Sequence, residues 1–140
     1  MNTVHTVDIA VTIGRTKIIL IERTKPPFMD KLVMPGGHVE PTDETFAAAC
    51  AREAREEIGL AVSPADLHFL TTIEGNNDPR PGHHTSHVFT IDFSSLEVLG
   101  ICAAGSDAKA IHIRELASIK PEEIGFDHLQ AIECLRKGLS

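Results

Sequence analysis

Hydrophobic and polar residues alternate along the first part of the chain. Val7, Ile9, Val11 and Ile13 fall on one face of residues 6–13, which predicts a β-strand. Gly14-Arg15 interrupts the pattern, and residues 17–23 predict a second strand that forms a hairpin with the first. Similar patterns predict strands at residues 32–34, 67–74, 86–93 and 111–113, with loops at 24–30 and 75–85.

Two other segments have helical spacing. Apolar residues between Ala47 and Ile58 form one stripe, and the helix is expected to begin near Thr42 or Asp43, either of which can cap it, and to end at Gly59. From Asp127 onward, apolar residues at helical spacing predict a second helix that ends before Gly138. Strands interleaved with two helices predict a layered α/β domain with a mixed sheet.

Composition restricts the class of protein. The 140 residues are expected to form a single domain, residues 1–140, and no apolar stretch is long enough to cross a bilayer. Cys50, Cys102 and Cys134 are odd in number and widely spaced, which predicts reduced thiols in a cytoplasmic protein. A formal net charge of −7 argues against a nucleic-acid partner.

The acidic residues are concentrated in one segment. Residues 40–57 contain six acidic and two basic side chains, a net charge of −4. Within it, Glu53, Glu56 and Glu57 have i,i+3 and i,i+4 spacing, so they project from one side of a helix and repel one another unless a cation binds. Hard oxygen ligands of this kind suit Mg²⁺ or Mn²⁺, which in turn bind phosphate oxygens.

This segment resembles the Nudix box, the signature of hydrolases that act on nucleoside diphosphates linked to another group. The matching residues are Gly37, Glu44 and the run Arg52-Glu53-Ala54-Arg55-Glu56-Glu57-Ile58-Gly59-Leu60. Six residues, where the family has five, separate Gly37 from Glu44, so the loop is expected to bulge at residues 40–43. The resemblance implies an α/β/α sandwich around a mixed sheet. The alternative is an ordinary acidic amphipathic helix after a Gly-Gly turn.

The resemblance also implies roles for these residues. Glu53 and Glu57 would be the main metal ligands, with Glu56 a third ligand or bridging through water, and the Gly37 carbonyl would complete the set. Arg52 would orient a glutamate by a charge-assisted hydrogen bond. Bound Mg²⁺ or Mn²⁺ would polarise the pyrophosphate and lower the pKa of an attacking water. Glu44 would anchor the junction of loop and helix.

A second resemblance, to bacterial and archaeal ADP-ribose pyrophosphatases, covers the rest of the chain. It rests on four short motifs in the same order, namely Arg23 with Phe28, Asp78-Pro79-Arg80-Pro81-Gly82-His83, Gly105-Ser106-Asp107-Ala108 and Phe126-Asp127-His128. Pro81 interrupts the aspartate–proline–arginine–glycine run of that family. The resemblance implies hydrolysis of ADP-ribose to AMP and ribose 5-phosphate, and such pyrophosphatases are often homodimers.

Several residues outside the Nudix box become candidates for the site. Arg23 and Arg80 would contact the diphosphate or the terminal ribose. Because the chain has no Trp or Tyr, Phe28 or Phe126 would stack on adenine. Asp107 would be a catalytic base.

Other interpretations remain open for these residues. The two arginines could be solvated surface residues, Asp107 could shape a turn, and Asp127 could cap the last helix. A zinc site at His83, His84 and His87 is a further alternative.

Two other functions compete with ADP-ribose hydrolysis. One is a Nudix hydrolase of another nucleotide, such as a nucleoside triphosphate, a dinucleotide or a sugar nucleotide. The other is a non-catalytic Nudix domain that senses ADP-ribose and is joined to a DNA-binding module. The sequence ends at Ser140 without room for such a module and keeps all three carboxylates, so an enzyme is favoured.

Overall fold

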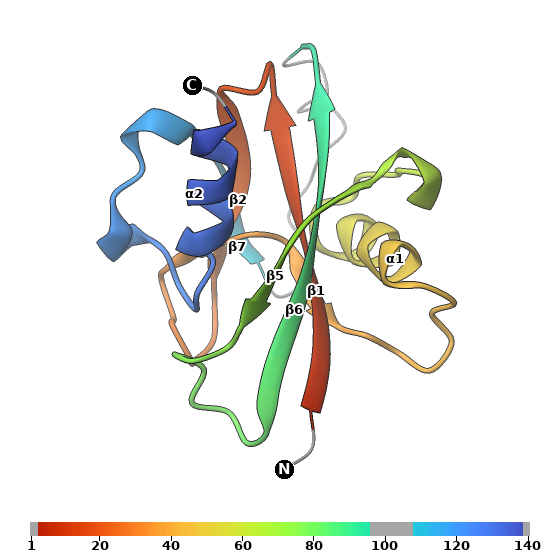
Figure 1. Cartoon of the computed structure of the whole chain (residues 1–140). Coiled ribbons are helices and arrows are strands. Elements are labelled where there is room, and N and C mark those ends of the chain that lie inside the picture. Colours follow the sequence, from red (N-terminus) through yellow and green to blue (C-terminus); the bar gives the residue numbers. More distant parts are fainter. Residues whose placement is uncertain (1–2, 96–107, 139–140) are drawn as a thin grey trace.

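A seven-stranded mixed sheet lies between two helices in the computed structural model, which describes residues 3–95 and 108–138 (Figure 1). Helix α1 (Phe46–Ile58) covers one face and α2 (Leu129–Lys137) the other. The strands are β1 (Thr3–Ile13), β2 (Lys17–Arg23), β3 (Leu32–Val33), β4 (Gly36–His38), β5 (His68–Glu74), β6 (His83–Phe93) and β7 (Ala108–Glu115). The predicted α/β/α sandwich is therefore confirmed.

Strand β1 is the centre of the sheet. It pairs in parallel with β6 along its whole length, from Thr3 opposite His83 to Ile13 opposite Phe93. Its odd-numbered apolar residues pack with α1, whereas Ala10 on the opposite face packs with α2. Because both faces are covered, every residue from Thr6 to Ile13 is buried, including the polar Thr6, Asp8 and Thr12.

The sheet divides along the other edge of β1. The end of β1, Val11–Ile13, pairs with β2 in the predicted hairpin, but Thr6–Asp8 pairs with β4. Strand β4 was predicted as loop, because two glycines carry no side-chain period that would indicate a strand. Its insertion separates β2 from the first half of β1, and α1 packs against both β1 and β4 at this division.

The start of α1 differs from the prediction. Thr45 is the N-cap, and its hydroxyl accepts a hydrogen bond from Ala48 N at 3.0 Å. Neither Thr42 nor Asp43 caps the helix, because the extra residue of this loop forms a turn closed by hydrogen bonds between Glu40 and Asp43. The predicted end is confirmed, with Gly59 in the left-handed conformation at a φ of 69°.

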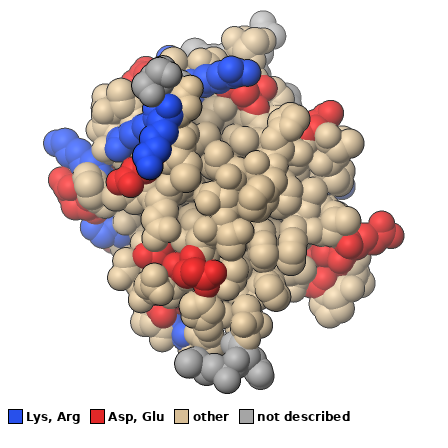
Figure 2. Space-filling view, viewed as in Figure 1, with Lys and Arg blue, Asp and Glu red and all other residues tan. Residues whose placement is uncertain are grey.

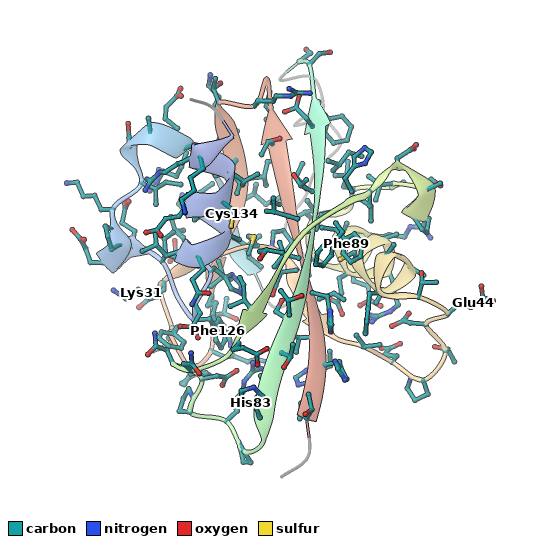
Figure 3. The ribbon with its side chains drawn as sticks, viewed as in Figure 1. Lys31, Glu44, His83, Phe89, Phe126 and Cys134 are labelled. Atoms are coloured by element: carbon teal, nitrogen blue, oxygen red, sulfur yellow. The ribbon has the colours of Figure 1, made fainter. Side chains whose placement is uncertain are left out.

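Charged side chains avoid the middle of one face of the molecule. Figure 2 shows this broad uncharged area, with Lys and Arg gathered on the side where α2 lies. Glu44 projects from the loop before α1, away from the sheet (Figure 3). It is exposed, and Asp43 instead links this loop to the helix.

Cys50 is a buried free thiol and Cys134 a half-buried one. No helix in the described residues is long and apolar enough to span a membrane.

Candidate active site

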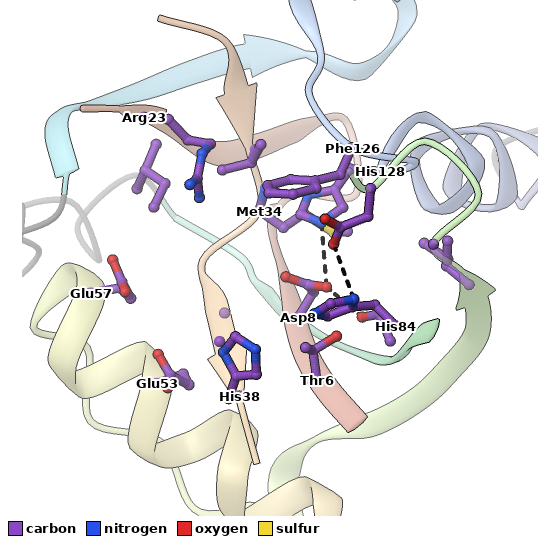
Figure 4. Close-up of a pocket in the computed structure, with 18 of the residues that line it drawn as sticks. Thr6, Asp8, Arg23, Met34, His38, Glu53, Glu57, His84, Phe126 and His128 are labelled. Atoms are coloured by element: carbon purple, nitrogen blue, oxygen red, sulfur yellow. Dashed lines mark hydrogen bonds and ion pairs between the residues drawn. The ribbon is translucent and has the colours of Figure 1, made fainter. Parts of the chain in front are cut away.

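A cavity of about 440 Å³ opens where the sheet divides (Figure 4). Residues from both sides of the division line it. They include Thr6 and Asp8 of β1, Arg23 of β2, Gly36, Gly37 and His38 of β4, Glu53, Glu56 and Glu57 of α1, Asp78 and Arg80 of the β5–β6 loop, His84 and Ser86 of β6, and Phe126, Asp127 and His128 before α2. This volume falls within the range of ordinary small-molecule sites.

Helix α1 supplies the acidic side of the cavity. Glu53 and Glu57 point from α1 towards the cavity in Figure 4. Glu53 is 7% exposed, and burial raises the pKa of its carboxyl above the ordinary value, although the hydrogen bond from Arg52 opposes this rise. A Cβ on Gly37 would lie 2.6 Å from Glu53 Oε1, so a larger residue at this position would displace the carboxylate that packs against β4.

Arg52 links this helix to the preceding loop. Its Nη1 donates to Glu53 at 2.9 Å and to Glu56 at 3.0 Å, while Nη2 donates to the His38 carbonyl at 3.0 Å. The Nε and Nη2 groups also bind both carboxylate oxygens of Asp43, at 3.0 and 2.9 Å. These contacts raise the pKa of Arg52 and lower that of Asp43. The guanidinium therefore fixes the orientation of Glu53 relative to β4.

The chemistry of the donor groups fits a hard divalent cation. Glu53, Glu56 and Glu57 line the cavity beside Gly37, and all of them offer oxygen ligands, which suit Mg²⁺ or Mn²⁺. In residues 3–95 and 108–138, no three such groups converge into a closed cluster, and Glu56 is bound to Arg52. Its carboxylate is the exposed member of the set, with a side chain 55% exposed, so it can turn without disturbing the core.

Cations and aromatic rings form another side of the cavity. The guanidinium carbons of Arg23 and Arg80 each lie 4.9 Å from the centre of the Phe126 ring. Phe28 also packs on Phe126, with ring centres 4.8 Å apart. Phe28 does not line the cavity itself, so its contact with the site passes through Phe126. Three of the four residues predicted to bind substrate thus line the cavity, and the fourth supports them.

The backbone is strained at both phenylalanines. Phe28 has a φ of 61° and Phe126 a φ of 52°, backbone angles that residues other than glycine rarely adopt. Glycine at position 125 lets Phe28 pack closely against the backbone next to Phe126, because a Cβ there would lie 3.0 Å from Phe28 Cβ and from Val33 Cγ1. Such strain persists where the surrounding structure enforces it, often at functional sites.

A buried carboxylate fixes the orientation of Arg80. Asp78 accepts hydrogen bonds from the backbone N of Arg80 and from its Nε and Nη2. Burial alone would raise the pKa of Asp78, but the hydrogen bonds from Arg80 outweigh it and hold this pKa below its ordinary value. Arg80 is therefore held at the cavity by an ion pair.

Sequence reasoning missed Asp8 and Ser86, which form the polar floor of the cavity together with His128. His128 accepts a hydrogen bond from Met34 N at 3.0 Å through Nδ1, and its Nε2 lies 3.3 Å from Asp8 Oδ2. Ser86 also donates to Asp8 Oδ2. Since Nδ1 of His128 accepts a hydrogen bond from the Met34 backbone N–H, the imidazole proton is on Nε2 and points towards Asp8. A charged residue inside an otherwise buried strand was the available signal for Asp8.

Of the remaining candidates, only His84 is placed at the cavity among the described residues. Asp107 lies outside the described residues, and its role as a base stays a prediction. His84 lines the cavity, whereas His83 binds Glu74, and His87 stacks on Phe46 with ring centres 3.7 Å apart. Alternate residues of β6 point to opposite faces, so these three histidines do not converge.

An α/β/α sandwich in which a carboxylate-bearing helix follows the Gly-Gly strand β4 and faces arginines across a cavity is typical of metal-dependent enzymes that act on diphosphates. The pattern of the NUDIX domain matches residues 3–135, and the chain therefore belongs to the NUDIX family. No protein of curated function matches the sequence significantly.

Solved structures share the fold. The NUDIX domain of Shewanella oneidensis NrtR complexed with ADP ribose is 23% identical, with a TM-score of 0.82, over 100% of this chain and 90% of that one. A bifunctional NMN adenylyltransferase/ADP ribose pyrophosphatase from Francisella tularensis, complexed with AMP and a manganese ion, is 27% identical, with a TM-score of 0.80, over 99% of this chain.

The length covered differs among these structures. The chain spans 42% of the Francisella protein. It spans 62% of a MutT/nudix family protein from Enterococcus faecalis, which is 21% identical with a TM-score of 0.81 over 99% of this chain.

Proposed function

We propose that this protein hydrolyses a nucleoside diphosphate linked to another group, with Mg²⁺ or Mn²⁺ as cofactor, and that its substrate is ADP-ribose, cleaved to AMP and ribose 5-phosphate. The observation that carries the proposal is the single cavity lined both by Glu53, Glu56 and Glu57 and by Arg23 and Arg80. A diphosphate needs both groups, because a divalent ion and guanidinium groups each bind its oxygens. The cofactor requirement follows from the donor set.

In this proposal Glu53 and Glu57, with Glu56 and the Gly37 carbonyl, would hold the metal ion. When bound there, the ion would polarise the diphosphate and lower the pKa of a water. Arg52 keeps Glu53 oriented through the hydrogen bond at 2.9 Å and offsets part of its charge. Asp107 is proposed as the base that accepts the proton of the attacking water.

The other side of the cavity would bind the rest of the substrate. Arg23 and Arg80 contact the diphosphate or terminal ribose, where a guanidinium donates two hydrogen bonds at once. Phe126, supported by Phe28, offers a ring on which adenine stacks. The Francisella protein, 27% identical, is described as an ADP ribose pyrophosphatase and was solved with AMP and manganese, which supports both substrate and cofactor.

A panel of nucleotides tests the substrate. Purified protein with Mg²⁺ or Mn²⁺ is incubated with ADP-ribose, NADH, a diadenosine polyphosphate and nucleoside triphosphates, and products are separated by chromatography. We expect the highest kcat/KM for ADP-ribose, with AMP and ribose 5-phosphate released in equal amounts. A strong preference for a triphosphate would overturn the assignment of ADP-ribose.

A sensor is the second candidate, favoured by the likeness to NrtR. Shewanella oneidensis NrtR, 28% identical over 96% of this chain with a TM-score of 0.75, was also solved with a DNA 27mer, and this chain spans 62% of it. A sensor would bind ADP-ribose in the presence of Mg²⁺ without releasing AMP. Calorimetry measures the binding of ADP-ribose and the assay measures the release of AMP. A sensor would give binding without release, so both measurements on the same samples separate the two functions.

A further inference from the structure

Asp127 does not cap α2, although it lies just before that helix. The N-cap is His128, which makes no side-chain cap hydrogen bond. Both oxygens of Asp127 instead accept hydrogen bonds from Asn77 in the β5–β6 loop: Oδ2 from the backbone N at 3.0 Å and Oδ1 from Nδ2 at 2.8 Å. Asp127 is 8% exposed. A buried carboxylate is thus used to hold a distant loop.

That loop carries Arg80. Asn77 immediately precedes Asp78, whose carboxylate binds the Arg80 backbone N, Nε and Nη2. The guanidinium is therefore held between Asp78 and the Phe126 ring, and Phe126 is the residue next to Asp127. In the described part of the chain, Nη1 of Arg80 has no hydrogen-bond partner, which leaves it available to a ligand.

The other described contacts of the loop backbone and of Asp78 stay close to the β5–β6 hairpin. The backbone hydrogen bonds from Gly75, Asn76 and Asp78 lie within it, and Asp78 Oδ2 lies 3.6 Å from Nδ1 of His84 on β6. Two glycines, Gly75 and Gly82, border the loop, and Gly82 has a φ of 92°. A flexible loop loses conformational entropy when it orders around a ligand, and a fixed anchor removes that cost from binding.

The anchor itself is rigid. His128, next to Asp127, is bound on one side to Met34 N and on the other to Asp8 of the central strand β1. Figure 4 shows His128 beneath the Phe126 ring and its contact with Asp8. The segment of Phe126, Asp127 and His128 is therefore tied to the sheet at one end and to the Arg80 loop at its middle.

We infer that Asp127 is a positioning residue: by binding Asn77 at two points it holds the loop so that Arg80 faces the cavity and receives the anionic diphosphate part of the nucleotide. This inference rests on the proposed function, since it deepens the role of Arg80 in substrate binding. In the described part of the chain, both side-chain hydrogen bonds of Asp127 go to Asn77 and none to the carboxylates proposed to bind metal, so chemistry at the metal is expected to proceed normally once substrate is bound.

An exchange of the two partners tests the inference. Asp127→Asn keeps one acceptor, and Asn77→Asp places two carboxylates together. In the double variant, the introduced amide donates to the introduced carboxylate while its oxygen still accepts the backbone N–H at position 77. We expect the KM for ADP-ribose to rise about tenfold in each single variant and to return near the wild-type value in the double variant, with kcat within about twofold throughout.

Arg80→Ala separates positioning from general stability. If Asp127 acts through Arg80, Asp127→Asn raises KM no further when Arg80 is already alanine. An equal rise with and without the Arg80 side chain would overturn the inference, as would a loss of kcat without a change in KM, or a double variant no better than the single ones.

A substrate-independent reading distinguishes failure of the inference from failure of the proposed function. The Nε–H resonance of Arg80, which reports its hydrogen bond to Asp78, is followed by NMR in the protein without nucleotide. We expect it to shift or broaden in Asp127→Asn and in Asn77→Asp and to recover in the double variant. An unchanged resonance in both single variants would overturn the inference even if ADP-ribose is hydrolysed. If ADP-ribose is not hydrolysed but the resonance responds as expected, the proposed function fails and the positioning stands.

Discussion

A side chain at Gly36 or Gly37 would meet a buried carboxylate. A Cβ on Gly37 would lie 2.6 Å from Glu53 Oε1, and one on Gly36 would lie 2.3 Å from Asp8 Oδ1. The two positions differ in their contact with the backbone, because a Cβ on Gly36 would also lie 2.2 Å from the Val7 carbonyl oxygen, whereas a Cβ on Gly37 would meet the Glu53 side chain. A side chain can rotate away from a new methyl group, but a paired strand cannot.

Alanine substitutions are expected to separate these two roles. Gly36→Ala should lower the free energy of unfolding by about 3 kcal/mol, because strand β1 must move. Gly37→Ala should cost about 1 kcal/mol or less but strongly reduce Mg²⁺-dependent activity, because it displaces Glu53. Urea unfolding and an AMP-release assay measure the two effects. Gly138→Ala, whose Cβ would meet no atom closer than 3.4 Å, is the control. Equal loss of stability at positions 36 and 138 would contradict this packing.

The ion pair of Asp78 and Arg80 predicts a pH dependence of stability. The pKa of Asp78 is lower in the folded protein than its ordinary value of 3.8, so its carboxylate stabilises the fold above that pH. The stabilisation is lost as the pH falls through the lower, folded pKa. Asp78→Asn should therefore cost about 1–3 kcal/mol at pH values near neutrality and progressively less below about pH 4.

Urea unfolding of both proteins across this pH range measures that dependence. Asp66→Asn, at an exposed position, is the control and should change stability by less than about 0.5 kcal/mol. A difference between wild type and Asp78→Asn that stays constant down to the lowest pH would exclude the lowered pKa.

At the scale of elements, the sequence predicted the strands and helix ends that depend on side-chain periodicity or on local residues. The bounds of β2 agree with the prediction, and Gly59 ends α1 as expected, because these features depend on local residues. Strand β4 could not be predicted, since its pairing with β1 depends on backbone alone. The start of α1 was missed because Thr42, Asp43 and Thr45 are all capping residues, and the choice depends on Asp43 binding Arg52.

The observed cap gives a direct prediction. Thr45→Ala should lower the free energy of unfolding by about 1 kcal/mol, because Ala48 N loses its acceptor. Thr42→Ala, in the exposed turn before the helix, should have an effect below about 0.5 kcal/mol. Thermal or urea unfolding of the two variants compares them. A larger effect at Thr42 would mean that α1 begins earlier than Phe46.

At the scale of the whole molecule, the cavity joins parts that are far apart in the sequence. Asp8 and Ser86 meet through the parallel pairing of β1 with β6, and His128 reaches Asp8 from the start of α2, which packs on the sheet. The Glu53–Glu57 segment was identifiable because all its members lie within two helical turns. No local pattern connects Asp8 with His128 or Asn77 with Asp127, so these contacts required the tertiary structure.

The central claim is that α1 supplies metal-binding carboxylates for cleavage of a diphosphate in this cavity. It is tested most directly by measuring Mg²⁺-dependent release of AMP from ADP-ribose by Glu57→Gln and by Glu133→Gln, a matched change at an exposed position on α2. We predict that Glu57→Gln lowers kcat about a hundredfold or more while the fold stays intact, and that Glu133→Gln retains wild-type activity. Wild-type turnover by Glu57→Gln, with the same dependence on Mg²⁺, would contradict the account.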